Sequence, residues 1–251
     1  YKAPDDGSYS LRHPEDTSNQ YYPEGILNKV VSYDADNKSV TVFTDMHGHK
    51  ILERTAAGDT YYVYNVLGQL RFVLSPSYQN SHDETISGYE YRYDDRGHMV
   101  KKVLPQCGTT QYWYDMADHV AYMRDPALGS RYRFYLYDNL GRLCVQGTCI
   151  DGNRDYSILS ATTYVSGSDG ICNSGYTVPY TINDPKLEIV NYYDNYDFIG
   201  KNLTSTMPTV TINQNQEQYA IGFQTGLLIY ATNGEALGSI EVYDYKGQVV
   251  R

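Results

Sequence analysis

The chain has 251 residues, a formal net charge of −10 and 29 tyrosines, against 5 phenylalanines and 1 tryptophan. A hydrophobic content of 41% and a charged content of 20% exclude an intrinsically disordered chain. No uninterrupted apolar run approaches the ~20 residues of a membrane-spanning helix. The acidic balance argues against nucleic acid or an anionic membrane as a partner, because both need basic surface.

The first predicted element is an N-terminal extension, residues 1–29, which is polar and punctuated by glycine and proline. A first strand is expected from Lys29 to Tyr33, and residues 30–251 are expected to form a β-sheet domain. No segment shows the 3.6-residue apolar periodicity of a helix, so the sequence predicts an all-β fold. Polar insertions are expected to interrupt the sheet near residues 75–88, 146–190 and 201–220.

One pattern recurs along the sheet domain: Tyr-x-Tyr-Asp, two further residues, Gly, a polar residue and an apolar residue. Where no insertion intervenes, neighbouring copies lie 20–23 residues apart, which predicts a repeat architecture. Four copies hold most of the pattern, at Tyr62, Tyr64, Asn65 and Gly68; Tyr91, Tyr93, Asp94 and Gly97; Tyr112, Tyr114, Asp115 and Asp118; and Tyr135, Tyr137, Asp138, Gly141 and Arg142. Weaker copies hold Thr44, Asp45 and Gly48; Tyr193, Asp194 and Asp197; and Tyr243, Asp244 and Gly247.

Each copy predicts a β-hairpin. The two tyrosines fall on one face of a strand, because side chains alternate with period two, and tyrosine has high strand propensity. The Asp or Asn starts a turn by accepting the backbone N–H two residues later, and the Gly supplies the positive φ that closes a four-residue loop. Asp118 and Asp197 occupy the Gly position in two copies, where Asp is tolerated better than most residues. A lone hairpin is marginal in water, so we expect the hairpins to stack side by side and bury their tyrosine faces.

The copy Tyr137-Asp138-Asn139-Leu140-Gly141-Arg142-Leu143 resembles the motif of the YD-repeat, or Rhs-repeat, family. The resemblance covers about residues 40–251 and implies repeated antiparallel hairpins that form a curved, twisted sheet, part of a shell. The family includes bacterial Rhs proteins and is related to toxin-complex shell subunits and teneurins, in which the repeats form a container or scaffold and a C-terminal cargo holds the chemistry. The motif arginine occurs here once, at Arg142, and the Asp-Pro core motif that precedes the cleaved toxin is absent. Self-cleavage and toxin activity are therefore not carried over to this chain.

The repeat positions also admit chemical interpretations. His49, His98 and His119 follow the turn Gly or Asp, where neighbouring strands could bring them about 5 Å apart in a metal-binding ladder. Gln and Arg occupy the same position in other copies, which favours a position beside the turn that simply accepts polar residues over a metal site. The repeated aspartates are compatible with paired catalytic carboxylates, but turn initiation already accounts for each of them. Residues 34–37 are partly similar to a calcium loop but lack its central Gly. No catalytic or nucleotide-binding motif occurs, so we expect no catalytic residue, cofactor or metal.

Four tyrosines lie in the insertions instead of the repeat and are the candidate ligand contacts: Tyr78, Tyr156, Tyr164 and Tyr176. Exposed aromatic rings can stack on sugars, whereas the repeat tyrosines are expected to pack between strands with their hydroxyls at the rim. The cysteines, Cys107, Cys144, Cys149 and Cys172, show no zinc-like spacing. Thiols packed as small apolar residues are the default expectation, and a Cys149–Cys172 bridge is the one disulfide worth testing.

The sequence therefore predicts a non-enzymatic structural or encapsulating segment of a larger, secreted or surface-exposed Rhs-type bacterial protein. Its expected partner is the rest of the same polypeptide, with further repeats and a C-terminal cargo. The alternative is a carbohydrate- or protein-binding module that uses the insertions and exposed tyrosines. No targeting signal is read in the chain, so the predicted location rests on the family resemblance.

Overall fold

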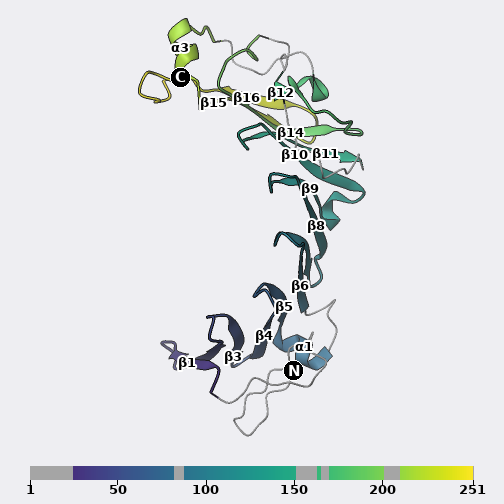
Figure 1. Ribbon diagram of the computed structural model, residues 1–251, viewed down its shortest axis with the longest axis vertical. Coiled ribbons are helices and arrows are strands. Elements are labelled where there is room, and N and C mark those ends of the chain that lie inside the picture. Colours follow the sequence, from purple (N-terminus) through teal and green to yellow (C-terminus); the bar gives the residue numbers. More distant parts are fainter. Residues whose placement is uncertain (1–24, 82–87, 151–162, 165–169, 201–209, 251) are drawn as a thin grey trace. The chain divides into compact units, whose positions relative to one another are not determined.

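The computed structural model describes residues 25–81, 88–150, 163–164, 170–200 and 210–250, and it is nearly all antiparallel β-sheet (Figure 1). The predicted all-β fold of antiparallel hairpins is therefore confirmed. The helices among these residues are short, and none has the length and apolar character to cross a membrane. The chain divides into two compact units, Tyr1–Gln111 and Tyr112–Arg251.

In the first unit each strand pairs antiparallel with the strand that follows it in the chain. The strand β1 begins close to the predicted residue, and a short helix, α1 (Pro76–Ser81), follows β5 in the predicted insertion at 75–88. The strands are β1 (Asn28–Tyr33), β2 (Ser39–Thr44), β3 (Lys50–Thr55), β4 (Gly58–Tyr64), β5 (Leu70–Leu74), β6 (Gly88–Tyr93), β7 (Met99–Leu104) and β8 (Gly108–Tyr114), whose last residues belong to the second unit.

In the second unit the strands pair in the order β9-β10-β11-β14-β15-β16. They are β9 (Val120–Arg124), β10 (Arg131–Tyr137), β11 (Leu143–Ile150), β14 (Lys186–Tyr193), β15 (Gln224–Tyr230) and β16 (Ala236–Ile240). The insertions contribute a separate strand pair, β12 (Thr163–Tyr164) with β13 (Tyr176–Thr177), and the short helices η2 (Ile171–Asn173) and α3 (Gln214–Tyr219), while η1 (Pro126–Leu128) connects β9 to β10.

In β4 and β10 the buried core lies on the strand face opposite the repeat tyrosines. In β4, Val63 is buried between the half-buried Tyr62 and Tyr64. In β10, Phe134 and Leu136 are likewise fully buried while the tyrosines beside them are not. The sequence predicted that stacked hairpins would bury the strand faces that carry the tyrosines, and this prediction is only partly confirmed, because these tyrosines are half-buried. In these two copies the residue between the two tyrosines builds the core, and the tyrosines cover the other face. The pattern is not general, because Arg92 is exposed between Tyr91 and Tyr93, and Tyr243 is itself buried.

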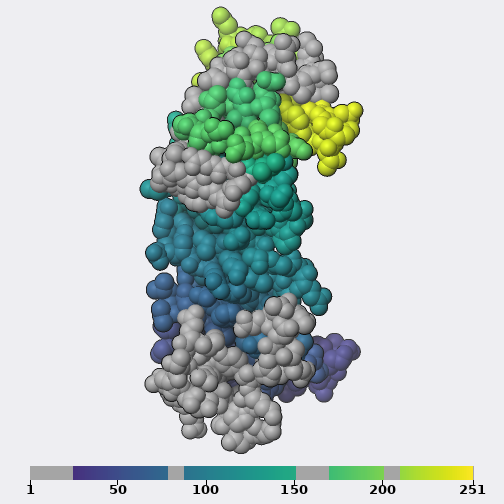
Figure 2. All heavy atoms as spheres, turned by 90° about the vertical axis from the view of Figure 1, so that its right-hand side faces the viewer, coloured from purple at the N-terminus to yellow at the C-terminus, as the bar shows by residue number. Residues whose placement is uncertain are grey.

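The residues that follow β14, up to residue 200, pack onto the core of the second unit. Phe198 is buried, and its ring centroid lies 4.2 Å from that of the buried Tyr192 on β14. A Cβ at Gly226 of β15 would collide with the Phe198 ring, so this close approach needs glycine. The Tyr196 hydroxyl donates to the Glu241 carbonyl at 2.9 Å, and the green and yellow segments that hold these residues lie against each other in Figure 2. The residues between β14 and β15 that contain Tyr196 and Phe198 therefore complete the core.

Candidate functional site

The turn that closes each repeat hairpin is built by its Asp or Asn side chain. One side-chain oxygen, Oδ1, accepts the backbone N–H groups two and four residues later, at 2.8–3.0 Å. The residues that do so are Asp45, Asn65, Asp94, Asp115, Asp138 and Asp244. These Asp and Asn side chains therefore have the turn-forming geometry that the motif predicts.

The turn Gly combines a positive φ with a close contact to the preceding hairpin. Gly68 has φ +77°, and a Cβ there would lie 3.2 Å from the His49 ring. Gly141 also has φ +77°, and its Cβ would lie 3.0 Å from His119 Nε2. Asp118 takes the same left-handed conformation, with φ +68°, as its position in the motif predicts.

The second tyrosine of each pair links its hairpin to the hairpin before it. Five such residues, which we call the ladder tyrosines, donate their hydroxyls to backbone carbonyl oxygens at 2.6–3.2 Å. The pairs are Tyr64 with Lys50, Tyr93 with Leu70, Tyr137 with Val120, Tyr193 with Leu143, and Tyr243 with Gln224. Every acceptor lies two residues after the turn Gly or Asp of the preceding hairpin, so the repeat specifies the contact between hairpins as well as each turn.

The ladder tyrosine rings also stack on the residue that directly follows the preceding turn Gly or Asp, which we call the platform residue. The ring of Tyr64 lies 4.6 Å from His49, and that of Tyr137 lies 4.5 Å from His119, both in stacked geometry. Arg142 lies 4.4 Å above Tyr193, and Phe223 stacks on Tyr243 at 4.6 Å. Histidine, arginine and phenylalanine can all act as the platform residue, because each presents a flat face to the tyrosine ring.

The platform histidines also bind the turn carboxylate of their own hairpin. His49 Nδ1 lies 2.9 Å from Asp45 Oδ2, and His98 Nδ1 lies 3.1 Å from Asp94 Oδ2. Partial burial opposes the shift, but hydrogen bonds from the backbone and ring of these histidines hold the pKa of both carboxyls below the usual value. Among the described residues, no group of three or more His, Cys, Asp or Glu side chains is placed to hold a metal ion. Stacking on a ladder tyrosine accounts for His49 and His119, and the contact with the turn carboxylate accounts for His98.

The copy at Tyr193 is a hairpin whose turn is interrupted by an insertion, residues 195–221. The Asp194 N–H donates to the Phe223 carbonyl at 3.1 Å, and the Gly222 N–H donates to Asp194 Oδ1 at 2.8 Å. Gly222, with φ +89°, thus supplies the turn Gly, and Phe223 is the platform residue. The prediction that Asp197 occupies the Gly position is wrong, because the chain leaves the turn directly after Asp194.

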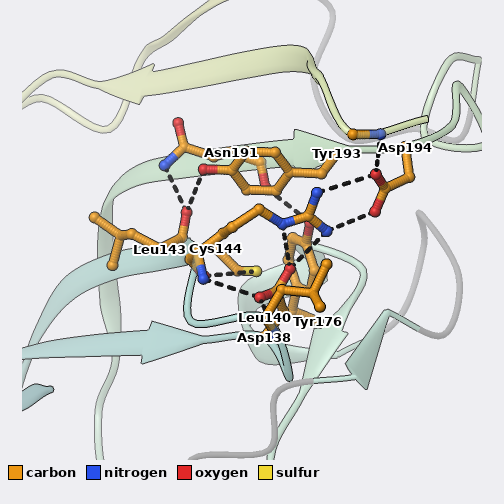
Figure 3. Close-up of polar contacts among 10 residues, drawn as sticks. Asp138, Leu140, Leu143, Cys144, Tyr176, Asn191, Tyr193 and Asp194 are labelled. Atoms are coloured by element: carbon orange, nitrogen blue, oxygen red, sulfur yellow. Dashed lines mark hydrogen bonds and ion pairs between the residues drawn. The ribbon is translucent and has the colours of Figure 1, made fainter. Parts of the chain in front are cut away.

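Arg142 holds this interrupted turn to the preceding hairpin. Its guanidinium donates to Asp138 Oδ2 at 2.7 Å and, through two nitrogens, to both Asp194 oxygens at 3.0 and 2.5 Å. Figure 3 shows the two aspartates on opposite sides of the group, with Tyr193 and Leu143 beside it. Hydrogen bonding to Asp194 raises the pKa of Arg142, and the same contact lowers the pKa of Asp194. The one motif arginine in the chain therefore stands where the turn needs a second anchor.

Two further turns of the same kind escape the sequence pattern. Asp34 Oδ1 accepts the N–H groups of Asp36 at 2.9 Å and Lys38 at 2.8 Å, and Asn37 has φ +61° in place of Gly. This turn joins β1 to β2 and explains the sequence that is partly similar to a calcium loop. The β15–β16 turn closes with the Ala231 N–H donating to the Glu235 carbonyl at 2.7 Å. The dipeptide Tyr33-Asp34 was a usable signal for the first turn, whereas the second has no Asp at its start.

The predicted ligand contacts do not gather at one site. Tyr176 is buried, stacks on Tyr192 at 5.7 Å between ring centroids, and donates to the Asn191 carbonyl at 2.8 Å, so it is a core residue. Tyr78 packs against the core of the first unit. Tyr164 lies in β12, and Tyr156 lies outside the described residues.

The cysteines are thiols, and no Cys149–Cys172 disulfide is present. Cys149 is buried while Cys172 is exposed. Burial raises the pKa of Cys144 to about 12, and its Sγ donates to the Arg142 carbonyl at 3.6 Å. The thiol of Cys144 is therefore protonated at neutral pH and unsuited to nucleophilic chemistry.

No family model matches the chain, and no curated protein matches it. Among solved structures, it is similar to the crystal structure of TcdB2-TccC3-TEV, with a TM-score of 0.46 and 13% identity over 86% of this chain. It is also similar to the crystal structure of TcdB2-TccC3, with a TM-score of 0.48 and 12% identity over 89% of this chain. The chain spans 9% and 11% of the length of those two chains.

Proposed function

We propose that the chain is a non-enzymatic scaffold, a segment of a wall of stacked hairpins in a larger, secreted or surface-exposed protein of Rhs type. The ladder tyrosines carry this proposal. Their hydroxyls bond the preceding hairpin at 2.6–3.2 Å, and their rings stack on its platform residue. The residues that define the repeat are thereby committed to holding hairpins together.

The turn carboxylates support a structural role in place of catalysis. Asp138 Oδ1 accepts two backbone N–H groups, and its Oδ2 binds Arg142. A general acid or base must exchange a proton with a bound substrate. The oxygens of this carboxylate are already engaged in the turn.

The remaining parts of the proposal follow from the resemblance of residues 137–143 to the YD-repeat motif. The partner is the rest of the same polypeptide, namely further hairpins and a C-terminal cargo that the wall encloses. The relation to bacterial toxins and the location outside the cell belong to the same proposal.

Limited proteolysis of the longer polypeptide that carries this chain tests the wall. A wall should protect the segment that follows the repeats, so this segment should survive a nonspecific protease in the native polypeptide and be degraded when expressed alone. The variant Tyr137→Ala, which removes one ladder contact, should increase digestion, whereas Tyr245→Ala, at a turn tip that is 71% exposed, should not. Equal digestion of the enclosed and the isolated segment would contradict an encapsulating role.

The second candidate function is a binding module. It is favoured by a cavity of about 670 Å³ in the second unit, at the end of β14 and β15, which is lined by both charged and apolar side chains. A glycan array separates the two candidates. Saturable binding by the isolated chain would support the module, and its absence would leave the scaffold alone.

A further inference from the structure

The cavity in the second unit arises because β14 and β15 separate at one end. The hydrogen-bonded ladder between them stops at the pair Ile189 and Ile229. Beyond it, β14 continues to pair with β11 as far as Lys186, and β15 continues to pair with β16 as far as Tyr230. The space between the separated strands is about 670 Å³, within the usual range for small-molecule sites.

Arg133 and Glu188 line one side of this cavity and belong to a prearranged polar network, which Gln146 completes from outside the lining. Arg133 Nε donates to Glu188 Oε2 at 2.9 Å, and Arg133 Nη2 donates to Oε1 of the same carboxylate at 3.2 Å. Gln146 Nε2 donates to Glu188 Oε2 at 2.9 Å. Such a paired and hydrogen-bonded network holds its side chains in place before a ligand arrives. The negative charge of Glu188 is also balanced by Arg133.

The cavity has a positive balance in an acidic protein. Lys186 lines it, is exposed, and forms no ion pair with any residue that the structure describes. The nearby carboxylate of Asp184, with which Lys186 interacts electrostatically, is paired with Arg131. With Arg133 and Glu188 paired, the ammonium of Lys186 leaves the ionised side chains of the cavity at +1, whereas the whole chain has a net charge of −10. A local cation of this kind favours an anionic group on the ligand.

The rest of the lining combines apolar surface with hydroxyl groups. Ile229 and Tyr230 provide apolar walls, and the side chains of Thr148 and Thr232 provide hydroxyls. The Tyr230 side chain is half-buried, and burial raises the pKa of its phenol, which therefore stays protonated as a hydrogen-bond donor. A sugar ring has a matching division, because its C–H face is apolar while its edge carries hydroxyls.

We propose that this cavity binds an acidic sugar, with the carboxylate at Lys186, the ring against Ile229 and Tyr230, and the hydroxyls at the Arg133–Glu188 pair. The volume of about 670 Å³ is within the usual range of sites for small molecules. The proposal goes beyond the scaffold function and does not depend on it, because none of these residues is a ladder tyrosine or a turn residue of the repeat motif.

Isothermal titration calorimetry of the chain with trigalacturonic acid tests the proposal. Saturable binding is expected, and galactotriose, the neutral counterpart, should bind at least tenfold more weakly. Lys186→Gln should weaken binding of the acid at least tenfold, while Lys246→Gln, which removes an exposed lysine from a turn of the same unit, should leave it unchanged. Both variants should keep the melting temperature of the wild type.

Three results would overturn the proposal. They are no saturable binding of the acidic sugar, equal affinity for the neutral sugar, or undiminished binding by the Lys186→Gln variant. Equal binding of triglutamate would also overturn it, because that would make the cavity a site for acidic groups in general. The protease test of the wall involves other residues, so either proposal can fail without the other.

Discussion

Replacing Arg142 by Met tests the anchor between two hairpins of the second unit. The substitution keeps an unbranched side chain of similar length but removes the guanidinium. Three hydrogen bonds to Asp138 and Asp194 would be lost, together with the contact above the Tyr193 ring. The two carboxylates would then face each other without a cation between them.

The expected cost is about 2.5–3 kcal/mol. Hydrogen bonds to charged groups contribute about 1.5–3 kcal/mol each when solvent is excluded. The side chains of Arg142 and Asp194 are 23% and 36% exposed, so the ion pair is partly screened and we take about 1 kcal/mol for each aspartate. The cation–π contact adds about 0.5–1 kcal/mol. For a chain of this length, each kcal/mol lowers the melting temperature by about 2–4 °C, so a decrease of about 5–12 °C is expected.

Thermal and urea unfolding, followed by circular dichroism, measure this cost. Lys246→Met is the matched control, because it removes a positive charge from an exposed turn of the same unit and should change stability by less than about 0.5 kcal/mol. A double-mutant cycle with Asp194→Asn should give a coupling of about 1 kcal/mol. If Arg142→Met costs no more than the control, the guanidinium does not hold the two hairpins together.

Three other predictions follow from the same contacts. The Arg142 partner lowers the pKa of Asp194 in the folded state, so the ion pair stabilises the fold at pH values above the unfolded-state pKa of about 3.9. This stabilisation is lost as the pH falls through the folded-state pKa, so the cost of Arg142→Met in urea unfolding should shrink in acid. A cost that does not change with pH would count against the ion pair. Tyr137→Phe should cost about 0.5–1.5 kcal/mol in urea unfolding and remove a phenol whose pKa burial raises to about 12, detectable by absorbance titration, whereas Tyr245→Phe, at an exposed tip, should cost nothing measurable. Gly141→Ala and Gly234→Ala both place a side chain at positive φ, which costs about 1–2 kcal/mol by itself. Gly141→Ala should cost more than Gly234→Ala, because only the Cβ at Gly141 meets a neighbour within 4 Å, and equal melting temperatures for the two variants would argue against close stacking on the platform residue.

Local residue patterns were enough to predict the hairpins. Asp138 and Gly141 build their turn through contacts within five residues of chain, so the information lies in the motif itself. The turn after Tyr33 follows the same chemistry with Asn37 at the Gly position, and it was missed because only Gly and Asp were accepted at that position. Such a turn is recoverable from sequence if Asn is accepted there.

The interrupted turn was beyond a local pattern. Asp194 and Gly222 meet across residues 195–221, and their contact depends on the insertion folding back onto the core through Phe198. The motif spacing, counted along the chain, instead placed Asp197 at the Gly position of this turn. The assignment of Tyr176 as a ligand contact failed for a related reason, because its burial depends on Tyr192, a residue of another segment.

The sequence by itself determined the all-β fold, the positions of most turns and the spacing of the tyrosines, because alternation along a strand and the closure of a short turn depend on neighbouring residues. The tertiary structure alone decided which strand face forms the core, which carbonyl each tyrosine hydroxyl binds, and where β14 and β15 separate to leave a cavity. These features depend on residues brought together from distant parts of the chain. The tertiary structure also explains the excess of tyrosine, because in most repeats one tyrosine binds the preceding hairpin through its hydroxyl.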